Sequence, residues 1–232
     1  MKALITAVLF CLVLNSSPFA ADRYQREDSS HRSFSDVFLR QDGSLKLARL
    51  FRKLFKSQEF ESHINPDQFY GTYLISKVNF IPVNRVKETI EKIMGLELQD
   101  RGEAHITVIT PPEHDAILAS VAEFSMEKVE ELVRNTIQNL RWDTLGVGAS
   151  RGKNGKGQYS EVYFLVVNSP QLRFIRERVA RYFNIPRDVF DPARQDFHVT
   201  IGFTESDLFG IPKDETSLEE SLRFDKLFKA GL

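Results

Sequence analysis

Hydrophobic and polar residues follow two periodicities along the chain, and these periodicities alternate in the same order twice. Residues 69–80 are rich in aromatic and β-branched side chains, which predicts a strand. Apolar residues then recur at the spacing of a helix: Val86, Ile90, Ile93 and Met94. Gly95 is placed to end that helix. The apolar run of residues 104–109 predicts a second strand, which Pro111-Pro112 would end.

The same order returns in the second half of the chain. Residues 159–167 predict a strand, and Ser169 followed by Pro170 predicts the start of a helix. The apolar stripe of this helix consists of Leu172, Ile175, Val179, Tyr182 and Phe183. Residues 197–201 predict the next strand. The repeated order of strand, helix and strand indicates a degenerate internal duplication, whose halves would pack about a pseudo-twofold axis.

Four further segments complete the predicted domain. Residues 129–137 predict a helix, residues 142–147 a strand and residues 217–228 a C-terminal helix that covers the core. Residues 146–157 contain five glycines and three cations. Their spacing fits neither a P-loop nor a dinucleotide-binding fingerprint, so we expect a flexible, solvated hairpin. A loop of this kind beside a site would also be able to hold a phosphate.

The N-terminal region divides into three segments. Residues 1–21 combine a lysine, an apolar run and small residues in the order of a secretory signal peptide. Residues 22–43 are polar and charged, which predicts a flexible leader. Residues 45–60 predict an amphipathic helix that packs on the core, although its basic face would also suit an anionic membrane or a phosphate backbone. We therefore expect a protein that is secreted or enters the lumen of the secretory pathway, with a single bilobed domain over residues 44–232.

Composition limits the functions that the chain can serve. The 232 residues are 42% hydrophobic, which indicates a globular protein. A net charge of -1 argues against stable binding of duplex nucleic acid, because such binding needs many lysine and arginine contacts to phosphates. Cys11, the only cysteine, lies in the predicted signal peptide, so the processed chain would have no disulfide and no thiolate nucleophile. We expect a monomer without a stable membrane contact.

Two tripeptides carry the candidate chemistry: His105-Ile106-Thr107 and His198-Val199-Thr200. Side chains of an extended strand alternate between two faces, so each histidine and its threonine point one way while the residue between them points into the core. If the two strands face each other across a cleft, both histidines and both threonines surround one substrate atom. The imidazoles would then supply a general acid and a general base, and the hydroxyls would supply hydrogen-bond donors.

With these motifs the chain resembles the two-histidine (2H) phosphoesterase superfamily, which includes RNA 2',3'-cyclic phosphodiesterases, 2'-5' phosphodiesterases and RNA-repair proteins. The resemblance covers residues 68–204 and is closest to the RNA-repair-like and 2',3'-cyclic phosphodiesterase branches. It includes the segment from Val199 to Phe203, which is typical of the second motif. The secretion signal departs from the family pattern, because most RNA-processing members work inside cells.

The resemblance implies a fold and an activity. The fold is of the α+β class and bilobed, and each lobe is an antiparallel sheet with helices packed on its outer face. The activity is that of a metal-independent phosphodiesterase without a cofactor, acting on a cyclic (2',3') or 2'-5' phosphodiester of a nucleotide or an RNA end. The catalytic residues would be His105, Thr107, His198 and Thr200. Which histidine is the acid and which is the base stays open.

Other functions compete with this one. A zinc site could combine the two histidines with Glu103 or Asp196, which share their faces, but such a site leaves the threonines without a role. The chain could also bind nucleotides or RNA ends without turnover, or act as a secreted effector through the basic helix of residues 45–60. Because both motifs are complete, catalysis is favoured. The remaining histidines, His31, His63 and His114, are expected to be solvated.

The sequence offers groups for substrate binding outside the two motifs. Aromatic side chains can stack on a base, and cations can hold a phosphate. We predict substrate-binding roles for Tyr73, Arg151, Lys153, Tyr159 and Phe203.

Overall fold

The computed structural model describes residues 57–64, 72–136 and 140–223, all of which belong to one compact unit, residues 34–232. The predicted signal peptide, the leader and the predicted helix up to residue 56 lie outside the described residues. In the described ranges, no helix has both the length and the apolar composition that crossing a membrane requires.

The first half of the described chain is built around a three-stranded antiparallel sheet with the strand order β1-β2-β3. Its elements are β1 (Ser57–Ile64), β2 (Thr72–Val78), α4 (Phe80–Met94) and β3 (Ala104–Ile109). Two helices follow, α5 (Pro111–Ser120) and α6 (Met126–Thr136). The motif strand β3 lies at the edge of this sheet, and its register places His105 opposite Lys77 of β2.

The second half contains a four-stranded antiparallel sheet with the order β6-β5-β4-β7. Its elements are β4 (Asp143–Lys153), β5 (Tyr159–Asn168), α7 (Pro170–Tyr182), β6 (His198–Phe203), the short 3-10 helix η1 (Glu215–Ser217) and β7 (Leu218–Arg223). The motif strand β6 is again an edge strand, and its register places His198 opposite Val166 of β5.

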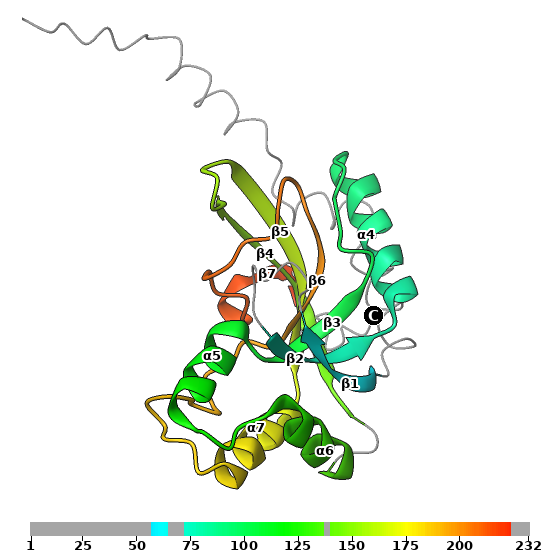
Figure 1. Ribbon diagram of the computed structural model, residues 1–232. Coiled ribbons are helices and arrows are strands. Elements are labelled where there is room, and N and C mark those ends of the chain that lie inside the picture. The colour runs from blue at the N-terminus through cyan, green and yellow to red at the C-terminus, as the bar shows by residue number, and fades with distance from the viewer. Residues whose placement is uncertain (1–56, 65–71, 137–139, 224–232) are drawn as a thin grey trace, which may run out of the picture. The chain divides into compact units, whose positions relative to one another are not determined.

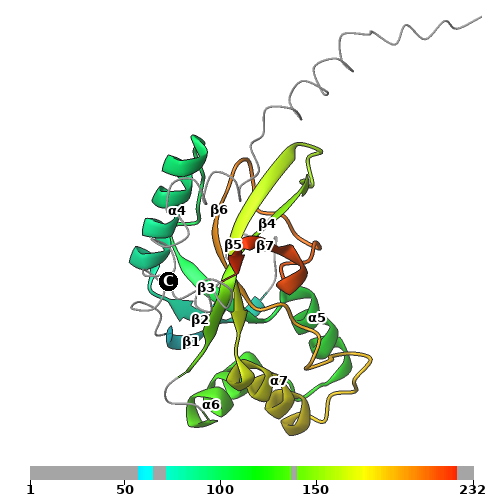
Figure 2. The same ribbon diagram turned by 180° about the vertical axis from the view of Figure 1, so that it is seen from behind.

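The two halves repeat one strand-helix-strand unit and share one core. The units β2-α4-β3 and β5-α7-β6 repeat the same order, as the sequence predicted. The edge strands β3 and β6 contact each other, and each repeat helix contacts the motif strand of the opposite half, α4 with β6 and α7 with β3. Figures 1 and 2 show β3 and β6 side by side between α4 and the α5–α7 group. Because both sheets are antiparallel and helices pack against them, the predicted α+β fold is confirmed.

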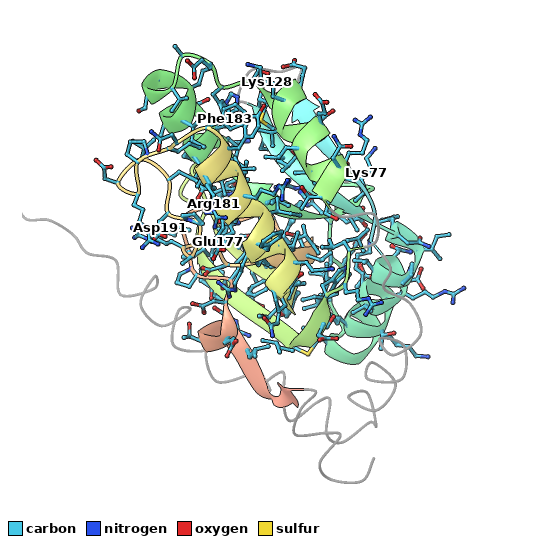
Figure 3. The ribbon with its side chains drawn as sticks, turned by 90° about the horizontal axis from the view of Figure 1, so that it is seen from below. Lys77, Lys128, Glu177, Arg181, Phe183 and Asp191 are labelled. Carbon is cyan, nitrogen blue, oxygen red and sulfur yellow. The ribbon has the colours of Figure 1, made fainter. Side chains whose placement is uncertain are left out.

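The predicted end of α4 at Gly95 and the predicted start of α7 at Ser169 are confirmed. The start of α4 was not predicted, and it falls at Phe80, inside the predicted strand of residues 69–80. Asn79 caps α4 by accepting the Ile81 N–H at 3.1 Å, and Gly95 ends it with a φ of 67°, in the left-handed region that suits glycine. Ser169 caps α7 by accepting the Leu172 N–H at 3.3 Å. In Figure 3 α7 lies beside α6, which it contacts. The caps fix the ends of the two repeat helices and therefore the length of chain that leads to each motif strand.

Two predicted helices are wrong where the structure describes them. Residues 57–60, predicted as the end of an amphipathic helix, are part of β1. The predicted C-terminal helix begins instead as η1 and β7, and β7 pairs with β4 in the second sheet. In both places an edge of a sheet was available, and pairing with it outweighed local helical periodicity.

The glycine-rich segment is more ordered than predicted. Residues 146–153 belong to β4, so only residues 154–157 form the turn of the hairpin. Gly148 shows why glycine stands in this strand: a Cβ atom here would lie 2.6 Å from Cε2 of Phe164 on β5. The glycine lets the two strands and this ring approach closely.

Helix α5 was missed, and with it the position of His114. Thr110 and Glu113 form a capping box at its start, with Thr110 accepting the Glu113 N–H and Glu113 accepting the Thr110 N–H. His114 follows in the first turn and is only 9% exposed, with its ring centroid 5.8 Å from that of Phe124. The prediction that His114 is solvated is therefore wrong.

Candidate active site

The alternation of each motif strand places its polar side chains on one face. In β3, Ala104, Ile106 and Val108 are buried, whereas His105 and Thr107 are half-buried. In β6, Val199 and Ile201 are buried, whereas His198 and Thr200 are half-buried. The apolar residues anchor each strand in the core and leave its histidine and threonine accessible from the other face.

One pocket brings both motifs together. It is lined by Asp100, Arg101, Glu103, His105, Thr107, His198, Thr200 and Ile201. The two halves contribute to it from their edge strands, which contact each other. The convergence of two imidazoles and two hydroxyls, predicted from the sequence, is therefore present in the structure.

The ring of His198 is held in one orientation. Its Nδ1 lies 2.9 Å from the main-chain carbonyl oxygen of Asp196, which can only accept, so Nδ1 carries a hydrogen. In the neutral ring, Nε2 then has the free lone pair. Burial and the positive charge of Lys213 lower the pKa of His198 to about 4. His198 is thus neutral at neutral pH and has a nitrogen that can accept a proton.

His105 has a different neighbour. Its Nδ1 lies 3.2 Å from Oε1 of Glu103, close enough for an ion pair when the ring is protonated, although the geometry is not that of a hydrogen bond. The ring of Tyr73 packs against the imidazole with 6.1 Å between centroids. Burial raises the pKa of Tyr73, which keeps its phenol neutral. Glu103 therefore places a negative charge beside His105, whereas Lys213 places a positive charge near His198.

The two threonine hydroxyls are available to a ligand. Among the described residues neither Thr107 Oγ1 nor Thr200 Oγ1 has a hydrogen-bond partner in the protein. The main chain of Thr107 is fixed, because Gln195 Nε2 donates to its carbonyl oxygen at 3.3 Å. Both hydroxyls line the pocket and are suited to donate hydrogen bonds to a charged oxygen.

The five residues predicted to bind substrate lie at several places. Tyr73 contacts His105, as described above. Arg151, Lys153 and Tyr159 lie on the β4–β5 hairpin and are not among the residues that line the pocket, and Arg151 Nε donates to Glu161 Oε1 at 3.0 Å. Phe203, at the end of β6, packs with a small apolar cluster and also lies outside the lining. Their roles in substrate binding stay predictions.

Sequence reasoning missed two charged residues of the pocket, Asp100 and Arg101. Asp100 pairs with Lys87 of α4. Arg101 Nη2 donates to Asp207 Oδ2 at 2.8 Å, across 106 residues of sequence. The only sequence signal was the position of both residues just before the first motif strand, which is too general to identify them.

The residues considered for a zinc site do not surround one point with the histidines. Glu103 lines the pocket, but Asp196 does not. Over the ranges that the structure describes, no three His, Cys, Asp or Glu side chains are grouped in a way that could hold a metal ion.

Comparison with known proteins identifies the family. A family model described as the Swiss Army Knife 2H phosphoesterase domain matches residues 72–209. The match includes both motif strands and all the residues that line the pocket. No curated protein and no solved structure matches the chain. The chain therefore belongs to the 2H phosphoesterase superfamily, whose activity is of the phosphodiesterase type.

Proposed function

We propose that the protein hydrolyses a 2',3'-cyclic or 2'-5' phosphodiester of a nucleotide or an RNA end, with His198 as general base and His105 as general acid. The observation that carries this proposal is the shared pocket, in which both imidazoles and both threonine hydroxyls meet. Such a set supplies every group that hydrolysis of a phosphodiester needs: a proton acceptor, a proton donor and donors for the charge on the non-bridging oxygens.

The different surroundings of the two rings support these roles. His198 is neutral at neutral pH, and its Nδ1–H is engaged by a carbonyl oxygen, so Nε2 is the atom that would take a proton from water. A proton on His105 would also oppose protonation of His198. Glu103, 3.2 Å from Nδ1 of His105, would stabilise the protonated ring from which a general acid donates.

The proposed reaction is one displacement at phosphorus. A water oxygen forms a bond to phosphorus while its proton moves to Nε2 of His198. The bond between phosphorus and the departing ribose oxygen breaks, and a proton from His105 neutralises that oxygen. Thr107 and Thr200 donate hydrogen bonds to the non-bridging oxygens, which gain charge in the transition state. The products are a phosphomonoester and a free hydroxyl. Proton exchange with solvent then returns His198 to its neutral form and His105 to its protonated form.

The test is a phosphorus NMR assay of turnover on 2',3'-cyclic AMP, which also reports which oxygen keeps the phosphate. We expect His105→Asn and His198→Asn each to lower kcat by about 10³-fold, within the range of general acid-base catalysis. Thr107→Val or Thr200→Val should cost on the order of 10²-fold. His114→Asn is the matched control, because His114 lies outside the pocket. Near wild-type turnover in a folded His105→Asn or His198→Asn protein would refute the proposed roles.

A 2'-5' linked dinucleotide provides the second substrate. Cleavage of the dinucleotide alone would select the linear diester, and cleavage of 2',3'-cyclic AMP alone would select the cyclic one. Binding of both by titration calorimetry without turnover of either would mean that the protein is a nucleotide-binding protein rather than an enzyme.

A further inference from the structure

The segment that follows β6, residues 204–214, folds back beside the pocket, and we call it the return loop. It lies between β6 and η1, shown in orange in Figure 1. Leu208 of this loop is buried in the small apolar cluster with Val162 and Phe164 of β5. Ser160 holds the loop from β5, because its Oγ donates to the carbonyl oxygen of Ser206 at 2.6 Å. These contacts fix the loop against the sheet that carries His198.

A pair of opposite charges is buried in the return loop. Lys213 Nζ lies 2.7 Å from Asp207 Oδ1, and the two side chains are only 6% and 7% exposed. The second oxygen of Asp207, Oδ2, accepts a hydrogen bond from Nη2 of Arg101 at 2.8 Å. One carboxylate is therefore shared by two cations, so it does not neutralise both Lys213 and Arg101. Burial raises the pKa of Asp207, but Lys213 and Arg101 outweigh it, so that the pKa lies below its ordinary value.

Arg101 is the member of this group that reaches the pocket. Its guanidinium lies 5.8 Å from the centre of the Phe209 ring, which also belongs to the return loop. Only one of its N–H groups has a hydrogen-bond partner among the described residues, the bond to Asp207. The two acidic residues that line the pocket have other neighbours, Lys87 at Asp100 and His105 at Glu103. Arg101 thus presents several N–H donors in a fixed direction.

The geometry points to Arg101 as the residue that binds the non-bridging oxygens of the substrate phosphate, with Asp207 and Lys213 as positioning residues that hold its guanidinium. This inference rests on the proposed function and names a substrate-binding residue for it. The N–H groups of an arginine match the positions of phosphate oxygens. The attraction between the guanidinium and the phosphate is stronger in the transition state than in the bound substrate, because a singly charged diester becomes a doubly charged monoester during hydrolysis.

The experiment compares Arg101→Met and Arg101→Lys with Arg134→Met, which removes an arginine on α6 whose side chain is 76% exposed. We expect Arg101→Met to lower kcat/KM for 2',3'-cyclic AMP by about 10²-fold and to weaken binding of adenosine 2'- and 3'-monophosphate at least about tenfold. Arg101→Lys should recover part of both losses, because it keeps the charge but not the fork. The control should match wild type in both assays.

Failure of the inference can be told from failure of the proposed function. If wild type hydrolyses 2',3'-cyclic AMP and Arg101→Met does so within about twofold, the role of Arg101 is refuted while the function stands. If wild type hydrolyses neither 2',3'-cyclic AMP nor the 2'-5' linked dinucleotide, the proposed function fails, and calorimetry with the two monophosphates decides the role of Arg101 alone. Equal affinity of wild type and Arg101→Met, or no binding by either, would refute that role.

The positioning role has its own readout. Asp207→Asn alone would leave Lys213 as a buried charge without a partner, so we pair it with Lys213→Met. If the two residues act through Arg101, the double variant lowers kcat/KM in the wild-type background but has little further effect when Arg101→Met is already present. Equal losses in both backgrounds would mean that the pair supports the fold rather than Arg101.

Discussion

Arg176 of α7 provides a test of how the fold holds the first motif strand. Its side chain is completely buried. The guanidinium donates two hydrogen bonds to the carboxylate of Glu113, at 2.7 and 3.0 Å. It donates three more to main-chain carbonyl oxygens, those of Val108 at 2.7 Å, Asp191 at 2.8 Å and Pro192 at 3.0 Å. The guanidinium carbon lies over the ring of Phe190, 4.3 Å from its centre. Arg176 therefore ties the end of β3 to the second half of the protein.

The change Arg176→Met should destabilise the protein severely. Removal of one partner from a buried ion pair costs about 3–5 kcal/mol, because the other charge loses its compensation. The carboxylate of Glu113 would lose its positively charged partner. Three carbonyl oxygens would also lose their donor. Methionine keeps much of the apolar stem, so loss of packing adds little. We expect a loss of about 4 kcal/mol in the free energy of unfolding, a large part of the 5–15 kcal/mol typical of a domain.

Urea denaturation measures this loss. With a denaturant dependence of about 2 kcal/mol per molar, the midpoint should fall by about 2 M. Arg173→Met is the matched control on the same helix, because Arg173 is exposed and makes one hydrogen bond within the described part of the chain, to the Ala193 carbonyl oxygen at 3.2 Å. It should cost less than about 1 kcal/mol. Combining Arg176→Met with Glu113→Gln should recover part of the loss. If Arg176→Met costs no more than the control, the argument from buried charge is refuted.

Three further predictions concern the second motif strand. The pKa of His198 is lowered to about 4, so the acid limb of the kcat/KM profile should lie well below pH 6.5. An acid limb at or above pH 6.5 would contradict the role of His198 as a base that is neutral in the free enzyme. The free energy of unfolding should also fall between about pH 6.5 and about pH 4, because the unfolded chain binds this proton more tightly than the folded protein does. Gly202→Ala should destabilise the protein by about 1–3 kcal/mol and lower kcat/KM, because the new Cβ would lie 2.9 Å from the carbonyl oxygen of Gln99. Gly155→Ala, where a Cβ would have no atom within 4 Å, is its control in urea denaturation and turnover assays.

The sequence predicted the parts of the fold in which local and tertiary preferences agree. The strand of residues 104–109 was predicted with its observed bounds, because its alternation matches the two faces of β3. Gly95 and Ser169 identified helix ends because capping depends on neighbouring residues alone. The four motif residues could be placed on one face of each strand for the same reason. Their duplication then indicated that the two faces meet.

The missed features depend on residues that are distant in sequence. The residues of β7 have helical periodicity but pair with β4, which only the folded sheet provides. Arg101 gains its significance from Asp207 and Lys213, which lie in the return loop after the second motif. Helix α5 is a different case, because the Thr110-to-Glu113 capping box is a local signal that the two prolines obscured. A proline at the first position of a helix starts it as well as ending the strand before it.

The active site and the joining of the two halves depend on the same contacts. Each motif strand lies at the edge of its sheet, where main-chain groups would otherwise lack partners. For β3, Gln195 and Arg176 of the second half bind the carbonyl oxygens of Thr107 and Val108. For β6, Gln99 of the first half exchanges two main-chain hydrogen bonds with Phe203, at 2.8 and 2.9 Å. Each half thus completes the edge strand of the other. Contacts between the halves thus hold both strands that carry the histidines, so a change far from the substrate, such as Arg176→Met, should also affect the active site.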